Sequence, residues 1–178
     1  MAYTFNKDNN TLLFDLPVAK NPALEMGFIP KAETHVTIIG YTAGRIISEH
    51  IKNCDRLKEL FYRIVDQYVY SRESEETGYD FMFPTDDQLH IIQKEYSSEE
   101  TRTSLIRFIA FDDTQGVFQI QMEALFPGIE EHLSKLHVTL GVDGDHPGIG
   151  LSRYTWYDGL VNKFTVGWPS SYENKQRS

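Results

Sequence analysis

The stretch "LHVTLGV", residues 136–142, repeats the pattern of "THVTIIG", residues 34–40. Each contains His-Val-Thr followed by an aliphatic residue, and neither belongs to a longer repeat. Both are rich in β-branched and aliphatic residues, which favour strands. We therefore predict that the same strand motif occurs twice, and that the fold is organised around it.

Strand geometry assigns the motif residues to faces. Successive side chains of a strand point to opposite faces, so His35 and Thr37 share one face, and His137 and Thr139 do likewise. The aliphatic neighbours anchor the opposite face. If the two strands lie side by side, two imidazoles and two hydroxyls converge on one cavity.

Other segments complete a mixed pattern. Apolar residues recur at three- and four-residue steps over 46–70, which predicts one long amphipathic helix or two shorter ones broken near Asn53. Residues 127–135 predict a short helix with acidic residues in its first turn. Strands are predicted, by alternation and turn residues, at 11–17, 88–96, 103–111 and within 153–168.

One segment, residues 117–125, fits either period; we favour a strand there and read 112–116 as a turn. Helices placed between antiparallel strand pairs indicate the α+β class. The chain length fits a single domain, which we place at 1–169, and the polar residues 170–178 are expected to be a disordered tail.

Composition limits the location and the partners. Cys54 is the only cysteine, so no internal disulfide forms and a reducing compartment is favoured. No signal peptide and no apolar run of membrane-spanning length is evident, so we expect no membrane association and a cytoplasmic protein, in the host cytoplasm if the source is viral. The net charge of −9 disfavours long duplex nucleic acid but permits a small anionic ligand. The sequence does not define an oligomeric state.

Two imidazoles and two hydroxyls suit phosphodiester chemistry. Attack at phosphorus needs one group that removes a proton from the nucleophile and another that protonates the leaving oxygen, and histidine performs either role near neutral pH. Hydroxyls at a fixed offset can hold the non-bridging oxygens of the phosphate. We expect His35 and His137 to be the acid and base, and Thr37 and Thr139 to bind phosphate.

These paired His-x-Thr motifs resemble those of the two-histidine (2H) phosphoesterase superfamily. Its members include 2′,3′-cyclic phosphodiesterases, 2′-5′ oligoadenylate phosphodiesterases and phage enzymes that degrade cyclic oligonucleotides. The resemblance implies a bilobal domain with two mainly antiparallel sheets, pseudo-twofold symmetry around a central cleft, and outer helices. It also implies metal-independent hydrolysis of a phosphodiester in a small nucleotide or oligonucleotide. It transfers to this chain only the four motif residues.

Substrate-binding residues are expected near the motifs, because nucleobases stack on aromatic rings and phosphates bind cationic side chains. Lys31 and Tyr41 flank the first motif, and Arg153, Tyr154 and Trp156 follow the second after a glycine-rich loop that could act as a lid. We take these five residues as candidates for substrate binding.

Two alternatives remain open. The chain could bind a nucleotide without turnover, or it could be a metal-dependent hydrolase that uses Asp143, Asp145 and His146. No His-Glu-x-x-His and no cysteine pair is present. We therefore expect neither a metal nor another cofactor, and we interpret His90 as a packed or surface histidine.

Overall fold

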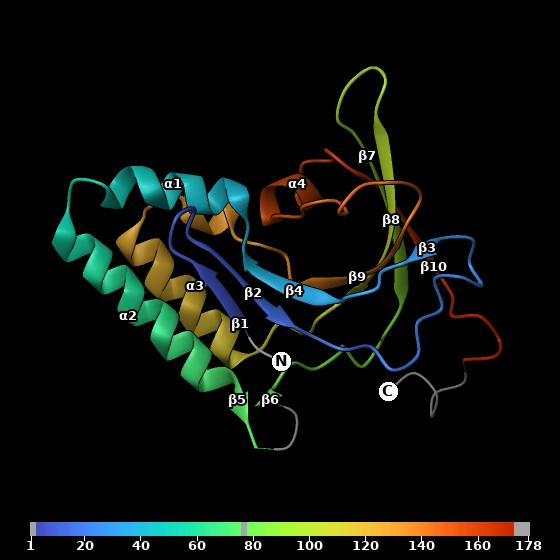
Figure 1. Ribbon diagram of the computed structural model, residues 1–178, viewed down its shortest axis with the longest axis horizontal. Helices are drawn as coiled ribbons and strands as arrows, with labels where there is room; N and C mark the ends of the chain where they lie inside the picture. Colours follow the sequence, from blue (N-terminus) through green and yellow to red (C-terminus); the bar gives the residue numbers. More distant parts are fainter. Residues whose placement is uncertain (1–2, 76–77, 173–178) are drawn as a thin grey trace.

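The computed structural model describes residues 3–75 and 78–172, and Figure 1 shows its arrangement. Eight strands form one antiparallel sheet in the order β1-β2-β4-β9-β8-β7-β10, and β3 pairs with β9 beside β4. Their bounds are β1 Tyr3–Asn6, β2 Thr11–Asp15, β3 Ile29–Pro30, β4 His35–Ile39, β7 Leu89–Glu95, β8 Thr101–Phe108, β9 His137–Val142 and β10 Asn162–Val166. The predicted α+β class is confirmed.

Four α-helices and one short 3-10 helix complete the described part. They are α1 Tyr41–Ile51, α2 Asp55–Arg72, α3 Asp113–Leu125, η1 Ile129–His132 and α4 Arg153–Tyr157. A two-stranded ribbon, β5 Glu73–Ser74 with β6 Gly78–Tyr79, follows α2. The resemblance implies two mainly antiparallel sheets, but the described residues form one large sheet, which contains both motif strands, and one small ribbon. None of the described helices is both long enough and apolar enough to span a membrane.

Most of the core lies on one face of the sheet. The side chains of β2 and β4 on this face pack against α1, α2, α3 and η1, and Phe14, Val36 and Ile38 are fully buried there. Figure 1 shows these helices gathered over the β1–β2–β4 end of the sheet. Further along the same face, Val138 and Leu140 pack with residues of the 16–28 segment. The aliphatic residues of both motifs therefore anchor the same face.

The opposite face is covered only in part. Ile92 and Ile106 pack there against Ile149, Leu151 and Val161, which the chain supplies after β9. This cover lies over β7 and β8. The motif strands β4 and β9 contribute no residue to it, and their histidine and threonine side chains occupy this face.

The structure resolves the helical alternatives. Residues 46–70 form two helices that break at Lys52–Cys54, as the second alternative proposed. The strand predicted at 117–125 is wrong, because α3 spans Asp113–Leu125. Asp112 caps this helix by accepting a hydrogen bond from the Gln115 backbone N–H, and Phe118 and Met122 bury one face at helical spacing.

The final predicted segment and the tail also differ in detail. Residues 153–168 contain one helix, α4, and one strand, β10. Residues 170–172 of the predicted tail are described, and the Tyr172 hydroxyl donates a hydrogen bond to the Asn21 carbonyl at 3.2 Å. The rest of that tail lies outside the described residues.

A buried ion pair joins α2 to the start of α3. Arg72 is 1 % exposed, and its guanidinium makes a two-pronged ion pair with the Asp112 carboxylate. The Tyr68 hydroxyl donates to Gln115 Oε1 at 2.7 Å in the same cluster. Both partners of this pair are hydrogen-bonded, which is the condition under which a buried charge is tolerated. The cluster fixes the position of Gln115.

Gly141 in β9 allows the 21–30 segment to lie against the motif strand. A Cβ atom there would come within 2.7 Å of Ala23 Cβ and 2.8 Å of Phe28 Cβ. We predict that Gly141→Ala lowers the free energy of unfolding by about 1–3 kcal/mol through overpacking. Urea denaturation measures this, with Gly144→Ala as the control because a Cβ there meets nothing within 4 Å. Equal stability of the two variants would contradict the prediction.

Candidate active site

The two His-Val-Thr motifs lie on neighbouring strands. β4 and β9 pair antiparallel, with Val36 aligned with Val138. In an antiparallel pair the residues on either side of an aligned pair also lie opposite one another, so His35 lies across from Thr139 and Thr37 across from His137. Period two places all four on one face of the sheet.

The hydroxyls and one imidazole of this group are available to a ligand. Within residues 3–75 and 78–172, no hydrogen bond occupies the side chains of Thr37, Thr139 or His35. All three side chains are half-buried. They can therefore meet a ligand without first breaking an internal hydrogen bond.

His137 is held more firmly. It is 8 % exposed, and its Nδ1 lies 2.8 Å from the Lys135 carbonyl oxygen. A carbonyl oxygen only accepts, so Nδ1 carries the proton and donates. In the neutral ring the lone pair is then on Nε2. This is the tautomer of a general base whose second nitrogen is fixed by the backbone.

Electrostatics favour the neutral form of both rings. Burial lowers the pKa of His137, and the charges of His35 and Lys135 lower it further, against the opposing effect of the backbone hydrogen bond. Burial and the charge of Lys31 lower the pKa of His35, although nearby carboxylates oppose this. The effect of His35 on the pKa of His137 reflects the proximity of the two rings.

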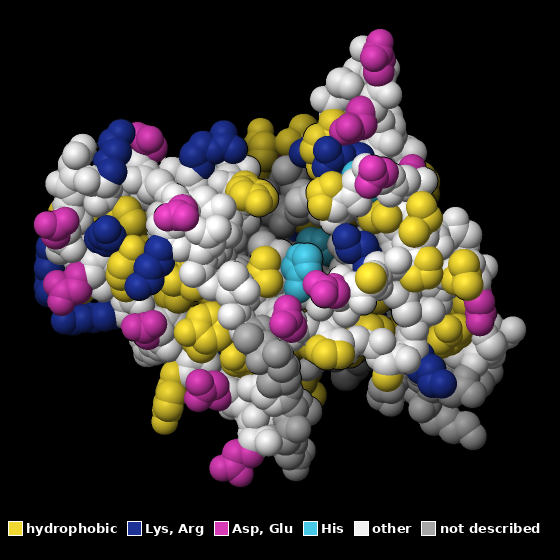
Figure 2. Space-filling model, viewed as in Figure 1, with side chains coloured by type: hydrophobic (Ala, Val, Ile, Leu, Met, Phe, Trp, Pro, Cys, Tyr) yellow, Lys and Arg dark blue, Asp and Glu magenta, His cyan; other side chains and the backbone are white. Residues whose placement is uncertain are grey.

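Figure 2 shows this face of the molecule. It is hollowed between the regions of α1 and α4, and histidine side chains lie near the centre of the face beside acidic ones. Histidine side chains are thus exposed near a concavity of this face.

The loop after β9 lies over Thr139. A Cβ atom at Gly148, whose φ is +116°, would meet Thr139 Oγ1 at 3.5 Å. Arg102 Nη1 donates to the Gly148 carbonyl at 3.3 Å and Lys31 Nζ to the Pro147 carbonyl at 3.5 Å. The loop predicted as a lid is thus held against one side of the motif pair.

The His146 side chain makes hydrogen bonds within this loop. Its Nε2 lies 2.7 Å from Asp143 Oδ1, and its Nδ1 accepts from the Gly148 backbone N–H at 3.1 Å. Both ring nitrogens are therefore engaged within the loop. Among the residues that the structure describes, no group of three or more His, Cys, Asp or Glu side chains could hold a metal ion.

The five candidate substrate-binding residues lie in different places. Lys31 is close enough to His35 to lower its pKa. Trp156 packs on the Phe108 ring, at 5.0 Å between centroids. Tyr41 begins α1 and is 74 % exposed. The other two, Arg153 and Tyr154, begin α4 and contact η1. Arg153 forms an ion pair with Glu130 at 2.7 Å, and the Tyr154 ring contacts the His132 ring.

Sequence reasoning missed two neighbours of His137, Phe108 and Lys135. Phe108 is its partner on β8, and the His90 ring packs on Phe108 at 4.7 Å. Lys135 Nζ lies 4.8 Å from the centre of the same Phe108 ring. The alternation Lys135-His137-Thr139 is a signal that could have found the lysine, because all three side chains share a parity.

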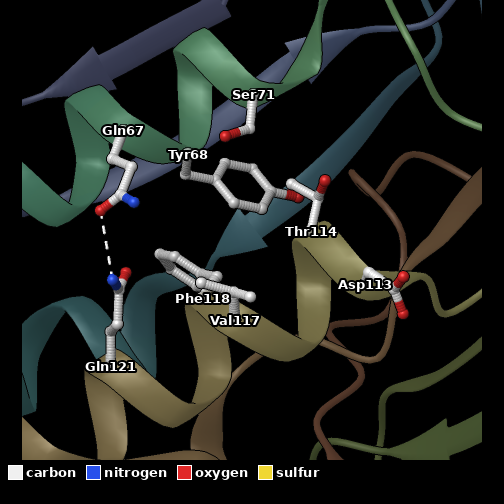
Figure 3. Close-up of a pocket in the computed structure, with 8 residues that line it drawn as sticks. All are labelled: Gln67, Tyr68, Ser71, Asp113, Thr114, Val117, Phe118 and Gln121. Atoms are coloured by element: carbon white, nitrogen blue, oxygen red, sulfur yellow. Dashed lines mark hydrogen bonds between the residues drawn. The ribbon is translucent and has the colours of Figure 1, made fainter.

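Two pockets lie among the described residues. One has a volume of about 300 Å³ and is lined by Phe111, Gln115, Lys135, Arg153 and Tyr157, among others. Lys135 precedes His137 by two residues. The other, of about 260 Å³, lies between α2 and α3, where Gln67 and Gln121 bridge the helices at 3.2 Å (Figure 3). None of the four motif residues lines either pocket, but Lys135 and Leu136, which directly precede His137, line the first. The second has no such neighbour and is separate from the candidate site.

No protein-family model, curated protein or solved structure matches this chain.

The arrangement supplies paired proton-transfer groups and paired hydrogen-bond donors. One ring is a fixed neutral base, the other is a free imidazole, and the two hydroxyls lie between them. Such a set can bind a tetrahedral anion and move protons at two of its oxygens.

The state of His137 can be tested directly by ¹⁵N-detected NMR of the imidazole nitrogens across pH 4.5–8.5. We predict the Nδ1–H tautomer and a pKa below the ordinary value of 6.5, because burial disfavours the charged ring. His137→Gln identifies the resonance. An Nε2–H tautomer, or a pKa above 6.5, would show that the Lys135 carbonyl does not hold the ring as described.

Proposed function

We propose that the protein is a metal-independent phosphodiesterase of the 2H type, which cleaves a phosphodiester in a small nucleotide or oligonucleotide. One observation carries the proposal: the aligned pair Val36–Val138 gathers both His-x-Thr motifs on one sheet face. The two buried valines fix this register, and the register brings both histidines and both threonines to the open face.

The proposed reaction divides proton transfer between the rings. His137 Nε2 removes a proton from the attacking oxygen, which is water or a ribose hydroxyl, as the new P–O bond forms. Protonated His35 donates to the leaving oxygen as the old P–O bond breaks. Thr37 and Thr139 donate hydrogen bonds to the non-bridging oxygens and keep attack in line with departure.

We further propose that the two sides of the β4–β9 pair are the two lobes of a 2H domain. β1, β2 and β4 with α1–α3 would form one lobe, and β9, β8, β7 and β10 the other, with the motifs in the cleft between them. The net charge of −9 supports a small substrate rather than duplex nucleic acid. The proposed place of action is the cytoplasm.

The activity is tested with 2′,3′-cyclic mononucleotides, 2′-5′ oligoadenylates and cyclic di- and trinucleotides. We expect cleavage of at least one class, and a loss of about 10²–10⁴-fold in kcat for His35→Ala and for His137→Ala, the usual value of a general acid or base. Activity should persist in EDTA. His132→Ala on η1 is the matched control and should retain activity.

Several outcomes would contradict the proposal. These are no cleavage of any substrate by folded wild-type protein, near-full activity of either motif variant, and complete loss of activity in EDTA. Circular dichroism of each variant excludes unfolding as the cause of inactivity.

The pH dependence follows from the lowered pKa values of both histidines. Catalysis needs one ring neutral and one protonated, and above both pKa values the protonated fraction falls as pH rises. We therefore predict that kcat/KM, which reports the free enzyme, is highest below pH 6.5 and falls about tenfold per pH unit above it. A flat or rising profile between pH 6.5 and 8.5 would contradict the assignment.

A further inference from the structure

Lys135 is a half-buried cation without an anionic partner in the described part of the chain. Its Nζ lies 4.8 Å from the ring centre of Phe108, 5.5 Å from that of Trp156 and 5.9 Å from that of Tyr157. No acceptor receives a hydrogen bond from it among the described residues. An ammonium placed this way retains three unused donors.

The neighbouring lysine behaves differently. Lys163 also lies over Trp156, at 4.1 Å, but it donates a hydrogen bond to the Trp156 carbonyl at 2.6 Å. Burial of the Lys135 side chain and the charge of Lys163 lower the pKa of Lys135. Lys163 thus has a hydrogen-bond acceptor, whereas Lys135 has neither an acceptor nor an anionic partner among the described residues. Lys135 can therefore bind an anionic ligand.

Lys135 is also positioned relative to the proposed chemistry. It precedes His137 by two residues, and the Phe108 ring beneath its ammonium belongs to the cross-strand partner of His137. Two residues of extended chain span about 6.8 Å. A second phosphate bound by the ammonium would therefore lie beside a phosphate bound between the histidines.

Beyond Lys135 lies the pocket of about 300 Å³, which falls in the lower range for ligand sites. Phe111 and Tyr157 are 66 % and 68 % exposed and offer rings for stacking. Gln115 also lines it, and because Gln115 Oε1 accepts from Tyr68, its Nε2 is a buried donor without a partner in the described residues. A nucleobase has the flat face and the acceptor atoms that such a pocket can bind.

We propose that this pocket holds the nucleotide next to the scissile phosphodiester, with Lys135 binding its phosphate, so that the substrate carries at least two phosphates. The proposal rests on the proposed function and narrows it from nucleotides in general to oligonucleotides. It places a 2′,3′-cyclic mononucleotide among the poor substrates.

Binding measurements test the second phosphate site separately from the proposed catalytic activity, because binding requires no turnover. The probes are adenosine 3′-phosphate and adenosine 3′,5′-bisphosphate, with the cytidine pair in parallel, titrated by calorimetry into the full chain. We expect the bisphosphate to bind about tenfold or more tightly than the monophosphate, since a charge-assisted hydrogen bond to a second phosphate is added. The advantage should shrink as salt is raised from 50 to 200 mM.

Variants assign the effect to the lysine. Lys135→Met keeps the length and apolar contacts of the side chain, and it should reduce the bisphosphate to the affinity of the monophosphate while changing monophosphate affinity less than twofold. Lys135→Arg should retain the preference. Lys7→Met is the control, because Lys7, in the turn between β1 and β2, also lies over an aromatic ring, that of Tyr62 on α2, at 4.9 Å.

The inference is overturned if the two probes bind equally, if neither binds, if Lys135→Met weakens both probes alike, or if a cyclic mononucleotide is cleaved as efficiently as any oligonucleotide. A merely structural lysine would lower thermal stability in Lys135→Met without changing the preference between probes. The proposed function fails independently, through absent cleavage or active histidine variants. Cleavage with no second-phosphate preference would leave it standing while removing this inference.

Discussion

The alignment of Val36 with Val138 is the constraint on which the site depends. Both valines are fully buried, and burying such a side chain contributes about 1.5–3 kcal/mol. A slip of one residue between β4 and β9 would put the valines on the open face and the imidazoles in the core. The hydrophobic requirement of one face thus sets the polar geometry of the other.

Burial also adjusts the chemistry of the histidines. The packing that stabilises β9 leaves His137 nearly inaccessible, which favours its neutral form, and the Lys135 carbonyl then selects the tautomer. His35 is less enclosed and has charged neighbours of both signs. One strand pair therefore presents two chemically different imidazoles, although the two local sequences are almost identical.

The secondary structure could be predicted from the sequence where the local pattern and the tertiary packing favour the same element. The two His-Val-Thr strands were predicted because alternation and β-branched residues indicate the same structure. The helix over residues 117–125 was not predicted, because the apolar positions of this segment satisfy both periods and only its packing in the core, where Phe118 and Met122 are buried, distinguishes them. The pocket lined by Lys135 was not predicted for the same reason, since Gln115 lines it from this helix.

The loop after β9 is attached by two kinds of contact. Arg102 and Lys31 contact the carbonyls of Gly148 and Pro147, and the side chains of Ile149 and Leu151 are buried against the sheet. The exposed Asp145 side chain takes no part in these contacts. The charge at this position can therefore change in evolution, or by engineering, while the four motif residues keep their positions.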